Sequence, residues 1–177
     1  MKKLALSVFY TLLGLFLVFV AGGFVLPDKA HVSRSALINA EPEKVFAVIS
    51  DLRQSQAWSP WFALDPQMSV TFEGDGPGVG QKMTWSSQHP NVGSGSQQTI
   101  GFVANKQVVV ALDFGEMGQA TGTMNLAGQD GGTKVDWAFD APLRNIIERW
   151  FGLVFDRMIG PDFEKGLANL KAYVEAN

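Results

Sequence analysis

The ionisable side chains that could do chemistry are few and are spread along the chain. Four carboxylates lie in or beside the predicted strands: Asp113, Glu116, Asp136 and Asp140. Two of them could act as an acid/base pair if they converged in an interior. Alternation along the last predicted strand, however, places Asp136 and Asp140 on the face opposite Trp137, where we expect water. The sequence therefore assigns no catalytic residue and leaves enzymatic activity an open alternative.

Motifs for metals, phosphates and nucleophiles are equally sparse. His31 and His89 have no second ligand at metal-binding spacing, and the chain contains no cysteine. The stretch GDGPGVG, residues 74–80, lacks the Gly-Lys-Ser/Thr ending of a phosphate loop and precedes a predicted strand. The run VGSGS, residues 92–96, does not match the G-x-S-x-G pattern of a nucleophilic serine. We therefore expect no metal and no cofactor.

The N-terminal segment is the most apolar part of the chain. The 23 residues 4–26 carry no charge and follow two lysines. As a helix they would extend roughly 34 Å, enough to cross a hydrocarbon core of about 30 Å. A signal peptide cleaved near Ala21-Gly22-Gly23 is the alternative, although its apolar region usually covers only about 7–15 residues. We predict a transmembrane anchor or uncleaved signal over residues 1–27 and one folded domain of the ligand-binding type over residues 28–177.

Charge indicates how the protein meets a membrane. Apart from Lys2 and Lys3, the chain carries 12 Lys and Arg against 17 Asp and Glu, a net charge of −5. This acidic excess excludes nucleic acid as a partner and argues against electrostatic docking on anionic lipid, so attachment must come from residues 4–26. A three-residue tail with two lysines is more easily kept inside than a folded domain. We expect a single-pass protein of a bacterial-type inner membrane, with its domain outside the cytoplasm.

The remaining residues predict one strand, short helices, a run of strands and a long helix. The first strand is expected at residues 32–38, and a helix follows from Pro42, which suits a first helical position. Between residues 68 and 140 the apolar residues alternate with polar ones and turn residues recur, as in antiparallel hairpins. From Leu143 onward apolar residues recur every three or four positions, as in an amphipathic helix. Gly160-Pro161 interrupts this pattern, so we expect a kink there or a new helix.

These elements predict an α+β domain whose arrangement over residues 28–177 resembles the helix-grip fold, with one N-terminal transmembrane helix added. In this fold a curved antiparallel sheet of about seven strands surrounds a long C-terminal helix, and two short helices follow the first strand. Motifs carry the resemblance further: AEPE at 40–43, AWSPWFALDP at 57–66 and FEKGL at 163–167. The chain resembles the polyketide cyclase/dehydrase-like branch of the helix-grip (START/SRPBCC) superfamily over roughly residues 32–175. This superfamily contains both binding proteins and enzymes.

The resemblance implies a cavity between the concave sheet and the C-terminal helix that holds an apolar or lipid-like molecule. The residues expected to line it are Trp61, Phe62, Trp85, Phe102, Met124, Trp137, Phe139, Phe151, Phe155 and Met158. The same large side chains could fill a core that has no ligand. In AWSPWFALDP, Pro60 and Pro66 are expected to stiffen a loop at the entrance, with Trp61 toward the pocket and Trp58 structural.

Three functions remain as hypotheses. We favour a membrane-tethered module that binds an apolar or lipid-like small molecule. A cyclase, dehydrase or hydrolase acting in the same cavity is the second hypothesis, and an accessory subunit with a membrane-protein partner and no ligand is the third. The apolar run Trp150–Phe155 is wider than one helical stripe requires. It predicts either a helix gripped on nearly all sides or an exposed patch that contacts lipid or another membrane protein.

Overall fold

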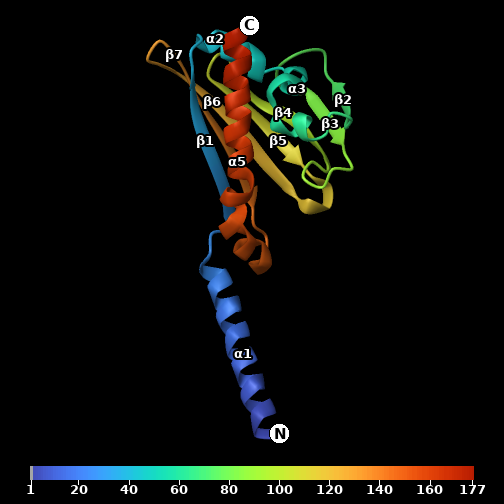
Figure 1. Cartoon of the computed structure of the whole chain (residues 1–177), viewed down its shortest axis with the longest axis vertical. Helices are drawn as coiled ribbons and strands as arrows, with labels where there is room; N and C mark the ends of the chain where they lie inside the picture. The colour runs from blue at the N-terminus through green and yellow to red at the C-terminus, as the bar shows by residue number, and fades with distance from the viewer. Residues whose placement is uncertain (1) are drawn as a thin grey trace.

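One antiparallel sheet of seven strands organises the chain, which we describe over residues 2–177 of a computed structural model (Figure 1). The strands are β1 Lys29–Ile38, β2 Ser69–Glu73, β3 Lys82–Ser86, β4 Ser94–Val103, β5 Gln107–Asp113, β6 Gln119–Gln129 and β7 Gly132–Pro142. Their order across the sheet is β1-β7-β6-β5-β4-β3-β2. The strands from β2 to β7 therefore form a meander, and β1 pairs with its end. Consecutive strands β1 and β2 lie at opposite edges, so the chain between them must cross a face of the sheet.

Short helices make that crossing on the concave face. They are α2 Pro42–Ile49, a 3-10 turn Leu52–Gln54, α3 Ser55–Trp58 and α4 Pro60–Leu64. Pro42 is at the start of α2, as predicted, and Pro60 likewise starts α4. The expectation of a proline-stiffened loop over AWSPWFALDP is therefore wrong. A proline at the first helical position loses no hydrogen bond, so Pro60 begins a helix instead of breaking one.

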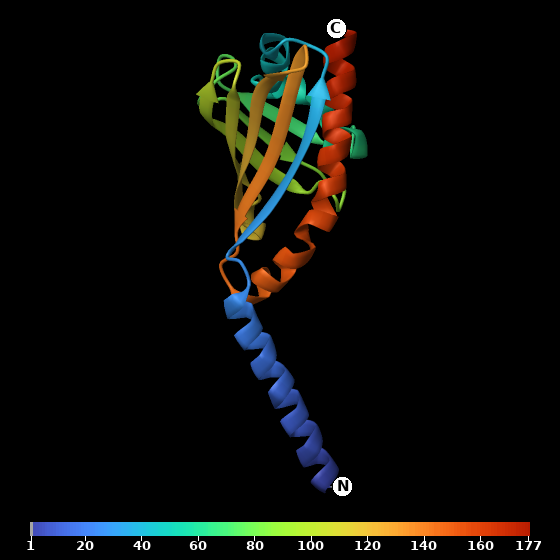
Figure 2. The ribbon, with the colours of Figure 1, turned by 90° about the vertical axis from the view of Figure 1, so that its left-hand side faces the viewer.

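The C-terminal helix, α5 Ile146–Ala176, is one continuous element that includes Pro161. The alternative of a new helix at Pro161 is wrong. The helix instead curves, as Figure 2 shows, so that its first turns slant away from the sheet and its later turns follow β1. A proline removes one helical hydrogen bond, which is a common cause of bending. Asn145 caps the start, because its side-chain oxygen accepts a hydrogen bond from the Glu148 amide at 3.0 Å.

The apolar N-terminal segment forms α1 Lys2–Val25, which projects away from the sheet (Figures 1 and 2). Within residues 2–177 it is the one helix long and apolar enough to cross a membrane, a property that anchors and signal sequences share. Its side chains are exposed except near its end, where it meets the start of α5. We call the end of the sheet nearest α1, where β1 begins at Lys29, the proximal end. The end at Ile38 is the distal end.

The expected helix-grip architecture is confirmed, with a core that lies mainly in the distal half. There the concave face of the sheet packs against α2, α3 and the second half of α5. Buried side chains that join these layers are Ile38, Val45, Phe46, Ile49, Trp58, Met124, Leu126, Val135, Trp137, Phe163, Leu167, Leu170 and Val174. Burying each large aliphatic side chain contributes about 1.5–3 kcal/mol, so this half supplies most of the fold's stability.

Candidate ligand-binding face

Small side chains occupy the proximal part of the concave face. The inward-facing positions nearest α1 are Ala30 on β1, Ala141 on β7, Ala120 on β6, Leu112 on β5 and Gln97 on β4. Gly122 lies in the next row, beside Phe139 and Val110. These small residues are covered by larger neighbours, since a β-carbon at Gly122 would come within 2.9 Å of Val110. The larger neighbours Trp85, Val110, Leu112 and Phe114 are only half-buried.

Aromatic side chains close the distal part of the same face. Trp137 on β7 lies 4.2 Å from Phe163 of α5, between ring centroids. Trp58 and Trp61 meet Trp137 edge-on, at 5.5 and 6.0 Å. Edge-to-face packing at these distances is favourable, so this half is a packed core. The boundary between the closed and the partly covered halves therefore runs along Trp137 and Trp61.

The first half of α5 borders the partly covered half without sealing it. Phe155 stacks on Phe139 with ring centroids 5.8 Å apart. Phe151 and Met158 lie about 40–60° around the helix from Phe155, at about 100° per residue, and are 57% and 56% exposed. They lie on the side of Phe155 away from β1, because Asp156 lies on the other side and contacts β1. These side chains thus form an apolar wall beside the small-residue region.

An arginine on the concave face determines where α5 lies. Arg34 of β1 donates to both oxygens of Asp156, at 2.7 and 3.1 Å, and to Glu164 at 2.7 Å. Gly160 lies between these acids on the helix, and a β-carbon there would come within 2.1 Å of the guanidinium. Missing side-chain bulk at Gly160 is therefore what lets the arginine reach both carboxylates. The helix is fixed to β1 at the sheet edge and packs mainly on β1, with little contact to β4, β5 and β6.

The ion pairs of Arg34 also shift the pKa values of the paired groups. The hydrogen bond from Arg34 holds the pKa of Asp156 below its ordinary value, and the bonds to Asp156 and Glu164 raise the pKa of Arg34. Among the strand residues within 2–177, Arg34 is the only ionisable one whose side chain points to the concave face. It is already paired with two carboxylates. The other inward strand positions carry apolar, amide and hydroxyl side chains.

The ten residues predicted to line a cavity fall into two groups. Trp85, Phe139, Phe151, Phe155 and Met158 border the proximal, partly covered half. Met124, Trp137 and Trp61 belong to the distal packing, and Phe102 lies against Phe46 of α2 at 4.9 Å. Phe62 is half-buried on α4. The assignment of these side chains to a ligand stays a prediction.

The half-buried side chains Val110, Leu112 and Phe114 were missed by the sequence interpretation. Their signal was present, because Val108, Val110 and Leu112 alternate with Gln107, Val109 and Ala111 along β5. Alternation identifies the inward face of a strand but does not say how much of that face the helix covers. That coverage depends on Arg34 and Gly160.

The candidate acids and histidines lie away from the concave face. Asp136 and Asp140 point outward from β7, where they pair with Lys134 and His31 at 2.8 Å each. Asp113 accepts hydrogen bonds from the Gly115 amide and the Gln119 side chain, which keep its pKa below the ordinary value. These contacts stabilise a turn and a strand edge. They do not form an acid/base pair.

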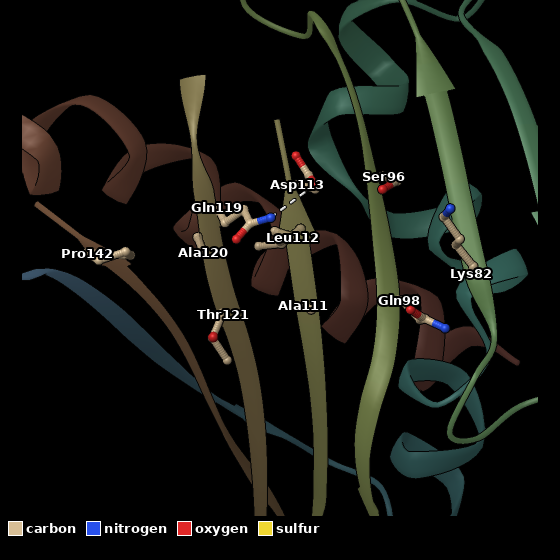
Figure 3. A pocket seen from close by; sticks show the side chains of 10 residues that line it. All are labelled: Lys82, Ser96, Gln98, Ala111, Leu112, Asp113, Gln119, Ala120, Thr121 and Pro142. Carbon is tan, nitrogen blue, oxygen red and sulfur yellow. Dashed lines mark hydrogen bonds between the residues drawn. The ribbon is translucent and has the colours of Figure 1, made fainter. Parts of the chain in front are cut away.

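A hollow of about 480 Å³ lies on the convex face of the sheet (Figure 3). Figure 3 looks at this face with the helices behind the strands. The lining is about equally polar and apolar: Lys82, Ser96, Gln98, Asp113, Gln119 and Thr121, together with Ala111, Leu112, Ala120 and Pro142. The sheet separates this hollow from the aromatic side chains predicted to bind a ligand.

The fold and its partly covered apolar face define a helix-grip domain of the ligand-binding type. The chain belongs to the polyketide cyclase/dehydrase and lipid transport family, whose model matches residues 29–175. This match includes every strand and nearly all of α5, and it begins just after α1. No curated protein matches the sequence significantly.

Solved structures share this fold at low sequence identity. A protein from Chromobacterium violaceum is 16% identical, with a TM-score of 0.59, over 82% of this chain and 97% of its own. A protein of unknown function from Staphylococcus aureus is 12% identical, with a TM-score of 0.65, over 84% and 94%. The di-domain ARO/CYC protein StfQ of the steffimycin biosynthetic pathway is 10% identical, with a TM-score of 0.63, over 84% and 51%. At such identities the likeness establishes the fold alone.

Proposed function

We propose that this protein is a membrane-tethered module that binds an apolar, lipid-like small molecule on the proximal half of its concave face. One observation carries the proposal. Half-buried Val110, Leu112 and Trp85 surround small inward residues opposite the apolar wall of α5. Half-buried apolar side chains around a concave surface gain free energy when an apolar ligand removes them from water, at about 25 cal/mol per Å². The family description, which includes lipid transport, agrees with such a ligand.

The tether in this proposal is α1, with residues 1–27 as the anchor and 28–177 as the binding domain. Support comes from Gly22 and Gly23, which lie against α5. A β-carbon at Gly23 would come within 2.3 Å of Ile146, and one at Gly22 within 2.8 Å of Trp150. The two glycines therefore have a packing role between α1 and α5, which cleavage at this position would remove.

The sidedness is proposed from charge. Lys2 and Lys3 precede the apolar segment and favour a cytoplasmic N-terminus. The domain would then lie outside the cytoplasm, on a bacterial-type inner membrane. Labelling of single-cysteine variants by a membrane-impermeant reagent tests this assignment, because the natural chain has no cysteine.

Two substitutions on neighbouring residues of β5 test ligand binding. Leu112 points toward the concave face, and Ala111 points to the convex face. The full chain is purified in mild detergent, and bound molecules are identified by native mass spectrometry and solvent extraction. We expect a bound apolar molecule in the natural protein and in Ala111→Gln, and its loss in Leu112→Gln with unchanged circular dichroism. Equal occupancy in both variants, or no bound molecule in the natural protein, would refute the proposal.

A further inference from the structure

Contacts between α1 and α5 fix the position of the first turn of α5 along the axis of α1. The Trp150 indole donates a hydrogen bond to the Phe19 carbonyl oxygen at 3.1 Å and stacks on the Phe19 ring, with centroids 5.4 Å apart. Ile146 lies on Gly23, and the Arg149 side chain donates to the Gly23 carbonyl at 3.4 Å. The start of α5 is therefore bound to the last two turns of α1.

This contact places Trp150 near the end of the apolar segment. Phe19 precedes Leu26 by about 10 Å along a helix that rises about 1.5 Å per residue. If α1 crosses a hydrocarbon core of about 30 Å centred on residues 4–26, Phe19 lies about 9 Å inside its edge. Trp150 therefore lies in the outer part of the apolar layer, where its N–H has the Phe19 carbonyl oxygen as its partner.

The first half of α5 carries more exposed apolar surface than sheet packing explains. Ile147, Phe151, Val154 and Met158 follow one another at spacings of four, three and four, and all are exposed. Leu153, 58% exposed, lies on the helix face that contacts α1, three residues after Trp150. This broad arc is continuous with the surface of α1. A water-exposed helix rarely presents such an arc, whereas interfacial helices do.

We propose that the first half of α5, residues 146–158, lies in the interface of the bilayer that α1 crosses, so that the partly covered face opens onto lipid. This inference rests on the proposed tether and specifies the ligand class as a bilayer-resident, apolar or amphiphilic molecule. Phe151 and Met158 adjoin Phe155, which stacks on Phe139 of the concave face. A lipid-like molecule could pass from the bilayer along these side chains to the sheet without crossing water.

The chemistry of the arc favours lipid over another protein. Transmembrane helices that pack on one another usually present small residues at the contact, as Gly22 and Gly23 do toward α5. The exposed arc instead presents Ile, Phe, Val, Leu and Met side chains. Arg157 also lies near the arc, four residues after Leu153. Its long side chain can extend from an apolar surface to lipid phosphates.

Fluorescence quenching by lipid tests this placement in the full chain. Single cysteines are introduced by Leu12→Cys in α1, Phe151→Cys and Val154→Cys in the arc, and Ala168→Cys in the exposed part of the second half. Each is labelled with an environment-sensitive fluorophore and placed, one chain per nanodisc, in phosphatidylcholine brominated on its acyl chains. We expect residues 151 and 154 to be quenched about as strongly as residue 12, and residue 168 to keep its brightness. Thermal unfolding of each variant verifies that it is folded.

The other possible outcomes distinguish a failure of the interfacial placement from a failure of the proposed membrane anchor. Quenching at residue 12 alone would overturn the interfacial placement and leave the anchor intact. Absence of quenching at residue 12 would overturn the anchor as well. Protection of residues 151 and 154 from aqueous iodide without quenching by brominated lipid would assign the arc to a protein contact, and the inference would be wrong.

Discussion

The two halves of α5 belong to one helix but have opposite surfaces. In the second half, Phe163, Leu167, Leu170 and Val174 are buried against the sheet and α2 to α4. In the first half, large apolar side chains of the same kinds are exposed, and the helix contacts the sheet through Phe155 and Asp156. The transition coincides with Gly160, where Arg34 fixes the helix to β1. One amphipathic helix can therefore stabilise the fold with one half and present an exposed apolar surface with the other.

The largest expected difference between the halves is in stability. Leu170 is fully buried, so Leu170→Ala should lower the free energy of unfolding by about 2–5 kcal/mol through lost burial and a cavity. Ile147 is 69% exposed, and Ile147→Ala should change it by less than about 0.5 kcal/mol. Urea unfolding of the full chain in one detergent, followed by circular dichroism, measures both. Similar losses would mean that the first half is also part of the core.

An intermediate effect is expected at the junction of the halves. Gly160→Ala should destabilise the natural protein, because the added methyl group displaces the Arg34 guanidinium from Asp156 and Glu164. In an Arg34→Ala background the clash is absent, and the same change should stabilise the helix by about 1 kcal/mol. The reversal of sign, measured by thermal unfolding of the four proteins, isolates the arginine contact. A destabilising effect of equal size in both backgrounds would contradict this role for Arg34.

The smallest expected effect is on the pH dependence of stability. It involves two carboxylates of α5, one near each end of its contact with β1. Hydrogen bonds from Arg34 and from the Asn39 amide lower the pKa values of Asp156 and Glu175 respectively. Because these folded-state pKa values are lowered, the stabilisation is complete above the ordinary carboxyl range near pH 4–5 and is lost as pH falls through the lowered values. Asp156→Asn should therefore weaken the fall in melting temperature between about pH 5 and 3. Identical pH profiles for the variant and the natural protein would rule out this contribution of Asp156.

Local sequence patterns predicted the elements but not every boundary. Alternation along β7 predicted its two faces, and Pro42 predicted the start of α2. The short helix α4 was missed, since Pro60 can either begin a helix or interrupt one. The sequence also left open whether the helix continues through Pro161. It does continue, because packing of Phe163 and Leu167 offsets the cost of one missing hydrogen bond.

The candidate face was only partly predictable. Aromatic residues on inward strand positions were identified, but Trp137 and Met124 lie in the packed half while Trp85 and Phe139 border the partly covered half. Sequence periodicity cannot distinguish these cases. The distinction depends on which part of the sheet α5 covers, and this depends on contacts between residues more than a hundred positions apart, such as Arg34 and Asp156.

The helix-grip class, the apolar N-terminal helix and the two faces of β7 follow from short-range periodicity and recognisable motifs, so they could be predicted from the sequence. The placement of the long helix depends on tertiary contacts. Arg34 reaches across Gly160 to hold α5 at the sheet edge, and Trp150 and Ile146 bind its start to α1. Long-range contacts of this kind leave no periodic signal, yet they determine which apolar side chains form the core and which stay exposed.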